Sequence, residues 1–370
     1  MTIDFLDLHK QYLSIKDEVD VAMTKVIASS AFIKSSPVTT FENEFAAYLK
    51  AEHVVSCGNG TDALEICLTA FGIGEGDEVL VPAMSWISTS EVVATRKATP
   101  VFVDIDAETY CIDVSKIEDK ITEKTKAIIP VHLYGHPADM MGIIELAKKY
   151  NLKVIEDCAQ AHGTEINGKK VGTFGDAATY SFFPTKNLGA FGDAGAIVVK
   201  DTNLKLKILA IANHGQEERH KHITHGRNSR MDGIQAAVLS VKLKYLEKWI
   251  NLRRKIANQY KEELTGMENI KLPVEASAAK HAYHLYVIRA ENRDGLKKNL
   301  QEKGIATMIH YPKALPFQLC YQDYDFEEVH FPVASKVQNE ILSLPFYPEF
   351  STEALKYVAM NIKDFYFEKA

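Results

Sequence analysis

The sequence at residues 151–200 is NLKVIEDCAQAHGTEINGKKVGTFGDAATYSFFPTKNLGAFGDAGAIVVK, and it contains three short apolar runs. These runs are LKVIED (152–157), ATYSFF (178–183) and GAIVVK (195–200), separated by polar and glycine-rich segments. Short apolar runs between turn residues are typical of strands buried in a sheet that helices cover. The stretch therefore predicts part of a buried β-sheet.

The same alternation extends toward the N-terminus as far as about residue 51. Apolar residues at helical spacing mark residues 61–74 and 138–151, and the second segment ends at an asparagine stop. Four further strands are expected at HVVSC (53–57), EVLVP (78–82), TPVFVDI (99–105) and KAIIPVHLY (126–134). Because alternating strands and helices build a largely parallel sheet, we expect an α/β fold with a large, mostly parallel, seven-stranded sheet domain.

The composition changes after Gly233. Residues 234–264 form one long helical pattern without Gly or Pro, long enough to bridge two domains. Two strands, at 281–290 and 305–312, and a helix at 293–304 are expected beyond it. We therefore expect a large domain at residues 1–245 and a smaller C-terminal α+β domain at residues 246–370.

Composition and charge exclude several classes of function. The 370 residues are 46% hydrophobic and 25% charged, which suits a soluble globular protein. A net charge of -6 gives no basic excess for nucleic acid or an anionic membrane. The N-terminus lacks the pattern of a signal peptide, and the five cysteines lack metal-ligand spacing. We expect a cytoplasmic protein with reduced thiols, no metal, and a small-molecule substrate.

A first candidate site is CGNGTD at residues 57–62, between a strand and a helix. Free N–H groups and the helix dipole favour an anion there, and glycines let the backbone approach it. Thr61 can add a hydroxyl donor, and Asp62 is a candidate helix cap. Taken alone, the six residues fit an ordinary tight turn better than a phosphate cup.

Two candidate catalytic residues lie further along the chain. Asp157 ends an expected strand, where carboxylates face the crevice of open α/β sheets, although it could instead cap the next turn beside a solvated Glu156. Lys186 follows another strand and precedes a glycine run, where desolvation would make it nucleophilic, although most loop lysines face solvent.

The order of these parts decides between the readings. The cup is followed by an aromatic residue at Trp86, then by Asp157 and Lys186. Pyridoxal 5′-phosphate (PLP) needs a phosphate cup, a carboxylate for its pyridine nitrogen and a Schiff-base lysine. The set therefore favours PLP chemistry.

Seven segments in their order and spacing resemble the DegT/StrS sugar aminotransferases, which are fold-type-I PLP enzymes with the aspartate aminotransferase fold. They are GNGTDALEICL (58–68), GDEVLVPAMSWISTSEVV (76–93), PVFVDIDAETYCID (100–113), TKAIIPVHLYGHPADM (125–140), VIEDCAQAHG (154–163), SFFPTKNLGAFGDAGAIV (181–198) and GRNSRMDGIQAAVL (226–239). The resemblance runs from about Phe5 to the C-terminus and implies a PLP-dependent transaminase.

The resemblance also implies roles for single residues. Lys186 would form the Schiff base and move the proton, Asp157 would pair with the pyridine nitrogen, and Gln160 would donate to the 3′-oxygen of the cofactor. Trp86 would stack on the pyridine ring. The remaining implied cofactor contacts are the phosphate cup of Gly60, Thr61 and Ser181 and the partner-reaching Asn228. The active sites would therefore be shared across a homodimer.

The implied reaction moves an amino group from L-glutamate to a nucleotide-linked keto-sugar, with ping-pong kinetics. Residues 229–249, 284–296 and 307–312 most resemble enzymes that aminate C3 of dTDP-linked 3-oxo-dideoxyhexoses in deoxyamino-sugar and surface-glycan (O-antigen) biosynthesis. UDP-linked 3-oxo or 4-oxo sugars stay open. Tyr311, beside His310, would lie at the sugar end of the cleft, although a core or interface tyrosine fits nearly as well.

Three alternatives remain to be compared. Some sugar 3-dehydratases of the family carry histidine at the position of Lys186, and an iron–sulfur dehydratase would need a cysteine cluster that this chain lacks. A DegT-like regulatory protein without enzyme activity would need a basic DNA-reading surface. The only basic candidate is residues 214–227, which are short and mixed in charge. For His214 and His225 within them, we expect a hydrogen-bonded loop role.

Overall fold

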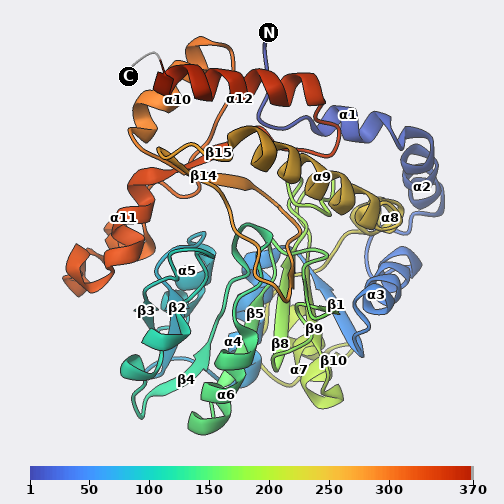
Figure 1. Cartoon of the computed structure of the whole chain (residues 1–370). Coiled ribbons are helices and arrows are strands. Elements are labelled where there is room, and N and C mark those ends of the chain that lie inside the picture. The colour runs from blue at the N-terminus through green and yellow to red at the C-terminus, as the bar shows by residue number, and fades with distance from the viewer. Residues whose placement is uncertain (368–370) are drawn as a thin grey trace.

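The computed structural model describes residues 1–367 and centres on one seven-stranded sheet (Figure 1). The strand order is β1-β9-β8-β5-β4-β2-β3. Their bounds are β1 His53–Cys57, β2 Glu78–Pro82, β3 Thr99–Val103, β4 Thr125–Ile128, β5 Lys153–Asp157, β8 Ala177–Ser181 and β9 Gly195–Val199. All pairs are parallel except the two that β9 makes with β1 and β8. The expected α/β class and the seven strands are confirmed.

Helices pack on this sheet and around its N-terminal edge. The helices before residue 213 are α1 Leu8–Leu13, α2 Lys16–Ser29, α3 Ser36–Leu49, α4 Gly60–Phe71, α5 Ser88–Thr95, α6 Met140–Tyr150 and α7 Thr202–Ala212. Helix α4 contacts β8, β9 and β5, and its apolar side is buried with theirs. Two short hairpins are also present, formed by β6 Glu165–Ile166 with β7 Lys169–Lys170 and by β10 Gln216–Glu218 with β11 Lys221–His222. Because α4 packs on β8, β9 and β5, its start is fixed beside the strands that end in the candidate residues.

The expectation of one continuous helix over 234–264 is wrong. The chain forms α8 Gly233–Leu243 and α9 Leu246–Leu264, joined at Lys244 and Tyr245. At the joint the N–H of Tyr245 bonds back to the carbonyl of Lys242 at 3.0 Å, a tighter three-residue step. The two helices face different cores, α8 toward α2 and α3 and α9 toward α12. Neither Gly nor Pro marks the break, so the sequence pattern concealed it.

The C-terminal part is a three-stranded antiparallel sheet covered by helices. Its elements are β12 Ile270–Lys271, β14 Tyr286–Ala290, α10 Arg293–Glu302, α11 Pro332–Glu340, β15 Ile341–Leu344 and α12 Thr352–Phe367, and β13 Ala279–Lys280 pairs with β6 instead. The strand expected at 305–312 is wrong, because that segment makes only single bridges at Ile305 and Met308. The true third strand, β15, follows α11 without a turn and was missed. Ile3 pairs with Ile305, and the domain boundary at 245/246 stays a prediction.

No helix between residues 1 and 367 combines the length and apolarity needed to cross a membrane.

Candidate active site

The candidate residues lie where β5 and β8 end and α4 begins. Asp157 is the last residue of β5 and Ser181 the last of β8, and these two strands are parallel neighbours. Gly60 opens α4 directly against Ser181, because a Cβ built on Gly60 would lie 2.7 Å from the Cβ of Ser181. The structure therefore brings together residues more than a hundred positions apart in the sequence.

The first turn of α4 forms a cradle of N–H groups. Asn59, and not Asp62 as we expected, caps the helix: its side chain accepts from the Asp62 N–H at 2.8 Å. Asp62 instead pairs with Arg227 at 2.9 Å. The N–H groups of Gly60 and Thr61 stand in the first turn, where a helix offers no internal acceptor. The turn can therefore receive an anion.

Asp157 is a buried carboxylate with two donors. Its residue is 5% exposed, and Thr89 Oγ1 and the Ala159 N–H donate to its two oxygens, each at 3.1 Å. Burial raises the pKa of Asp157, while these bonds and the charge of Lys186 act in the opposite direction. Through the Ala159 bond Asp157 also caps a turn, and this cap is compatible with a carboxylate that faces the crevice.

Lys186 lies in the loop after β8, with an amine crowded by protein although the residue is only partly buried. Burial lowers its pKa to about 8, and the nearby Asp157 carboxylate opposes that shift. A lysine with this pKa has a sizeable neutral fraction near neutral pH, as a nucleophilic amine requires. Because β5 and β8 are parallel neighbours, the loop that carries Lys186 leaves the same edge of the sheet at which Asp157 ends β5.

Gln160, Tyr311 and Trp86 form one wall of that space. Gln160 Oε1 accepts from the Tyr134 N–H at 2.8 Å, and its Nε2 donates to Tyr311 Oη at 2.9 Å. The ring centroids of Tyr311 and Trp86 are 5.7 Å apart at 45°. Trp86 is 57% exposed, which does not suit a helix-packing tryptophan and leaves a ring face for a planar ligand.

His310 and Tyr311 are neighbours that face different partners. His310 Nδ1 lies 2.8 Å from Ser343 Oγ, and its carbonyl accepts from the Tyr134 hydroxyl. Burial and then the charge of Lys186 lower the pKa of His310 to about 4, so the ring is neutral at physiological pH. Burial raises the pKa of Tyr311. Tyr311 therefore belongs to the wall that it forms with Gln160 and Trp86, whereas the His310 ring contacts Ser343 of β15.

Asn228 is exposed, in a segment whose neighbours contact the cradle. Ser229 Oγ accepts from the Gly58 N–H at 2.9 Å, and Arg227 pairs with Asp62. Asn228 itself bridges Asn213 through the backbone. His214 and His225 are exposed beside the β10–β11 hairpin, and the His214 carbonyl lies 2.8 Å from His222 Nδ1. Asn228 is therefore exposed beside the cradle, between two residues that contact it.

Sequence reasoning missed three residues of the site. Thr89, which holds Asp157, stands three positions after Trp86, and that spacing was the available signal. His162 and His284 are buried residues whose pKa values are lowered by burial and then by Lys186, that of His162 to about 3. Lone histidines in apolar segments gave no signal of this proximity. All three lie around the Lys186 amine or its carboxylate partner.

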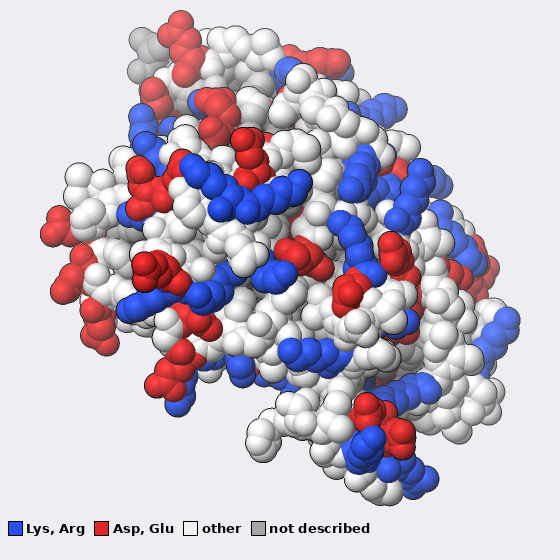
Figure 2. Space-filling view, turned by 90° about the horizontal axis from the view of Figure 1, so that it is seen from below, with Lys and Arg blue, Asp and Glu red and all other residues white. Residues whose placement is uncertain are grey.

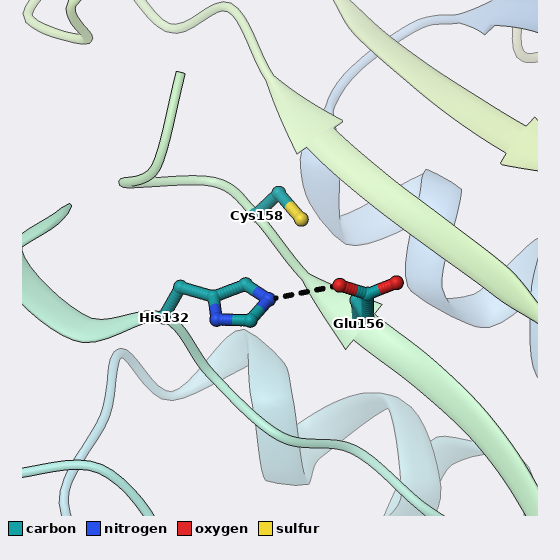
Figure 3. A group of neighbouring side chains, drawn as sticks. All are labelled: His132, Glu156 and Cys158. Atoms are coloured by element: carbon teal, nitrogen blue, oxygen red, sulfur yellow. Dashed lines mark hydrogen bonds and ion pairs between the residues drawn. The ribbon is translucent and has the colours of Figure 1, made fainter. Parts of the chain in front are cut away.

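Behind Asp157 lies a buried group formed by His132, Glu156 and Cys158, the one set among residues 1–367 with metal-ligand atoms close together (Figure 3). His132 Nδ1 accepts from the Ala138 N–H at 3.0 Å, so its Nε2 carries the proton that faces Glu156 at 3.1 Å. Burial keeps the pKa of Cys158 well raised, so the sulfur stays a thiol. The bond to Glu156 and the bond from the Ala138 N–H therefore occupy both ring nitrogens of His132 within the protein.

Glu156 instead anchors the chain. The alternative reading, in which Glu156 is a solvated charge beside Asp157, is wrong for Glu156, because this residue is 0% exposed. Besides His132 it accepts backbone N–H groups at 2.7–2.8 Å from Gly172, Phe174 and Gly175. Burial alone would raise the pKa of Glu156, but these bonds more than offset it and lower the pKa. The charged carboxylate thus fixes the end of β5 from behind.

Comparison with known proteins agrees with this geometry. The sequence profile of the DegT/DnrJ/EryC1/StrS aminotransferase family matches residues 13–363. A pleiotropic regulatory protein of Geobacillus stearothermophilus is 46% identical over 99% of both chains. The dTDP-3-amino-3,6-dideoxy-α-D-galactopyranose transaminase of Aneurinibacillus thermoaerophilus is 43% identical over 96% of this chain and 97% of its own. The UDP-N-acetyl-3-dehydro-α-D-glucosamine 3-aminotransferase of Acidithiobacillus ferrooxidans is 41% identical over 98% and 97%.

Solved structures give the same result. S. venezuelae DesV, in complex with a ketimine intermediate, superposes with a TM-score of 0.96 at 38% identity and 98% coverage of both chains. NtdA from Bacillus subtilis, with bound pyridoxamine phosphate, superposes with a TM-score of 0.91 at 33% identity over 98% of this chain and 85% of its own.

The resemblance, the fold, the enzyme class and, at the level of the family, the cofactor are thereby confirmed. The profile match covers nearly the whole length, and relatives above 40% identity cover almost all of it. The chain therefore belongs to the DegT/DnrJ/EryC1/StrS aminotransferase family.

Proposed function

We propose that this protein is a PLP-dependent aminotransferase that moves an amino group from L-glutamate to a dTDP-linked 3-oxo-dideoxyhexose. The observation that carries the proposal is the placement of Asp157 and Lys186 beside the α4 cradle: Asp157 ends β5, and its parallel neighbour β8 ends against Gly60 and leads into the Lys186 loop. The nucleotide-sugar substrates named for relatives support the acceptor class.

The residues fit the cofactor. Gly60 and Ser181 approach so closely that a side chain on Gly60 would fill the cradle, which supports a phosphate site bounded by backbone N–H groups. Lys186 offers an amine for the aldehyde, and Asp157 offers a carboxylate for the pyridine nitrogen. When bound, PLP supplies an electron sink for negative charge that develops at the substrate carbon.

The chain's own residues supply the acid–base chemistry. Thr89 and the Ala159 N–H donate to Asp157 and stabilise its anionic form against the cost of burial. The carboxylate can therefore hold a proton on a facing ring nitrogen. Lys186, with a pKa of about 8, can take a proton as a neutral amine and return it as an ammonium.

The aromatic wall orients what binds. Gln160 is fixed by the Tyr134 N–H, so its Nε2 is directed to Tyr311 and to the space beyond it. The exposed face of Trp86 suits a flat ring and keeps water from it. We assign Tyr311 and His310 to the sugar end of the cleft.

We also propose that the working unit is a homodimer with shared active sites. Asn228 is exposed next to two residues that contact the cradle. A hollow of about 950 Å³ lies beside it, between α3, α7 and the β10–β11 hairpin. Leu206, Leu209 and Ile223 line this hollow with exposed apolar surface. Replacing Asn228 with Ala should weaken PLP retention; a fully active monomer would contradict the shared site.

The names of two relatives favour a regulatory function without catalysis: the pleiotropic regulatory protein of Geobacillus and a sensory transduction protein of Saccharopolyspora erythraea. Charge argues against it. Figure 2 shows Lys and Arg mixed with Asp and Glu over the face seen from below, without a broad basic patch. In the 214–227 segment, Lys221 pairs with Glu217.

The five cysteines are free thiols, which supports a reducing compartment such as the cytoplasm.

The test is an absorbance spectrum of the purified protein with added PLP, followed by L-glutamate and then a panel of dTDP- and UDP-linked 3-oxo and 4-oxo sugars. We expect a band near the visible edge that bleaches with glutamate and returns with the dTDP-linked 3-oxo sugar. Lys186→Ala should lack both the band and turnover. Return with a UDP-linked or 4-oxo sugar would replace the acceptor, and no band at all would refute the cofactor assignment.

A further inference from the structure

The loop that carries Lys186 is folded tightly between β8 and β9. The Lys186 N–H bonds to the Phe183 carbonyl at 2.9 Å, and the Ala190 N–H bonds to the Phe182 carbonyl at 2.8 Å. A Cβ on Gly189 would lie 2.3 Å from the carbonyl oxygen of Pro184, so this close fold requires glycine. The loop's own bonds fix its shape but leave its placement on the domain to other contacts.

One such contact is the bond from Asn187 Nδ2 to the Ala282 carbonyl at 3.2 Å, and helix α8 supplies others through two side chains on one face. Lys242 Nζ donates to the Gly189 carbonyl at 2.6 Å. Gln235, two turns earlier, accepts from the Phe191 N–H at 2.8 Å and donates back to the Phe191 carbonyl at 3.4 Å. Gly189 and Phe191, three and five residues after Lys186, are therefore both attached to α8.

Lys242 is an unusual residue for this position, because it is only 2% exposed. Its Nζ has the Gly189 carbonyl and the Phe191 ring, 5.2 Å away, as partners, with the Glu349 carboxylate as the nearby opposite charge. Burying an ammonium without a direct carboxylate partner is costly. An apolar side chain would stabilise the core better, so the amine serves a purpose other than stability.

A second buried cation on the next helix follows the same pattern. Arg253 of α9 donates to the carbonyls of Tyr283 and His284, each at 3.2 Å. His284 is one of the residues whose pKa responds to Lys186. Lys242 of α8 and Arg253 of α9 are thus both buried cations that donate to backbone carbonyls.

We propose that Lys242, together with Gln235, is a positioning residue that holds the Lys186 loop on α8 and so keeps the Lys186 amine directed at Asp157. The proposal rests on the assignment of Lys186 as the reactive amine. Without the Gly189 bond the loop is free to shift on α8, and a misplacement of the amine by about 1 Å costs roughly 100-fold in rate.

The test compares Lys242→Met with Lys248→Met, a control at an exposed lysine of α9. Amide hydrogen exchange is measured on the full-length protein without cofactor. We expect at least tenfold faster exchange in residues 182–194 of Lys242→Met and unchanged exchange in β2 and β3. Equal exchange in both variants, or a uniform rise across the sheet, would overturn the proposal.

Kinetics give a second readout. Lys242→Met should lower kcat about 100-fold with little change in KM for the sugar, and Lys242→Arg, which keeps a donor, should recover most of kcat. A normal kcat would overturn the proposal. If Lys242→Met does not fold, Gln235→Leu at a partly exposed site takes its place, and unchanged loop exchange there also overturns it. The exchange result does not depend on the sugar, so it stays separate from a failure of the proposed function.

Discussion

Replacing Gly60 with Ala tests whether the start of α4 binds the cofactor phosphate. The added Cβ would lie 2.7 Å from the Cβ and 3.3 Å from the Oγ of Ser181, whereas ordinary contact begins at 3.4 Å. One side must therefore move by at least 0.7 Å, which displaces either the first N–H groups of the helix or the hydroxyl that faces them.

The expected loss follows from this displacement. Overpacking of this kind costs about 1–3 kcal/mol. If the strain is relieved by widening the cradle, it weakens PLP binding by roughly 5- to 140-fold, since about 1.4 kcal/mol is tenfold. The assay is a PLP titration of the cofactor-free protein, followed by absorbance or by quenching of intrinsic fluorescence.

A matched control separates this effect from that of adding any methyl group. At Gly74 a Cβ would lie 3.4 Å from the Arg96 carbonyl, an ordinary contact, and its φ is not in the left-handed region. Gly74→Ala should therefore leave PLP affinity unchanged. If Gly60→Ala folds and binds PLP within twofold of the unsubstituted protein, the phosphate does not lie at this turn.

Three further predictions follow from the site. The rate at which the cofactor-free protein condenses with PLP should rise with pH and level off above about 8, whereas the rate for an ordinary lysine would keep rising toward pH 10.5. Asp157→Asn should lower the midpoint of this pH profile, because the carboxylate opposes the lowering of the Lys186 pKa. An unchanged midpoint in stopped-flow absorbance would contradict the interaction between Asp157 and Lys186. Glu156→Gln should lower the free energy of unfolding in urea by about 3 kcal/mol, since bonds to a buried charge are lost. The pKa of Glu156 is lowered in the folded protein, so its charge stabilises the fold above about pH 4.5, and this stabilisation is lost as the pH falls through the folded pKa. A stability difference between the two proteins that stays constant from pH 3 to 7 would refute this prediction. Tyr311→Phe should weaken PLP binding about tenfold by leaving the Gln160 amide without its acceptor while keeping the ring, and an equal dissociation constant would remove that bond from the account.

The sequence predicted the sheet better than the C-terminal part, for a physical reason. Buried strands such as LKVIED carry continuous apolar runs, so their positions were visible without tertiary information. The break between α8 and α9 and the direct passage from α11 into β15 carry no Gly or Pro, because packing against different cores imposes them.

The site could be predicted only where a motif reports chemistry. Asp157 was visible as the end of a strand and Lys186 as a lysine that follows one, and their order along the chain indicated a cofactor. Thr89 and Glu156 were not, because their roles arise from neighbours in space: one donates to Asp157, and the other accepts backbone N–H groups from a distant loop. We expected Asp62 to cap α4 and missed Asn59. Asp62 lies two residues inside the helix, where its carboxylate pairs with Arg227, and Asn59 is the cap.

The antiparallel strand β9 sets when this site can assemble. Strand β1, which leads into the α4 turn, pairs only with β9, with Cys57 opposite Gly195, and β9 in turn pairs with β8. A Cβ on Gly195 would lie 2.4 Å from the backbone of Asn59, so the cap of α4 is also shaped by this contact. During synthesis the turn at Gly60 can therefore be completed only after β9, which lies more than 130 residues later in the chain, has been made. A growing chain that ends between residues 187 and 194 carries Lys186 and Asp157 but lacks β9, so we expect that PLP can stabilise the fold only after β9 has been added.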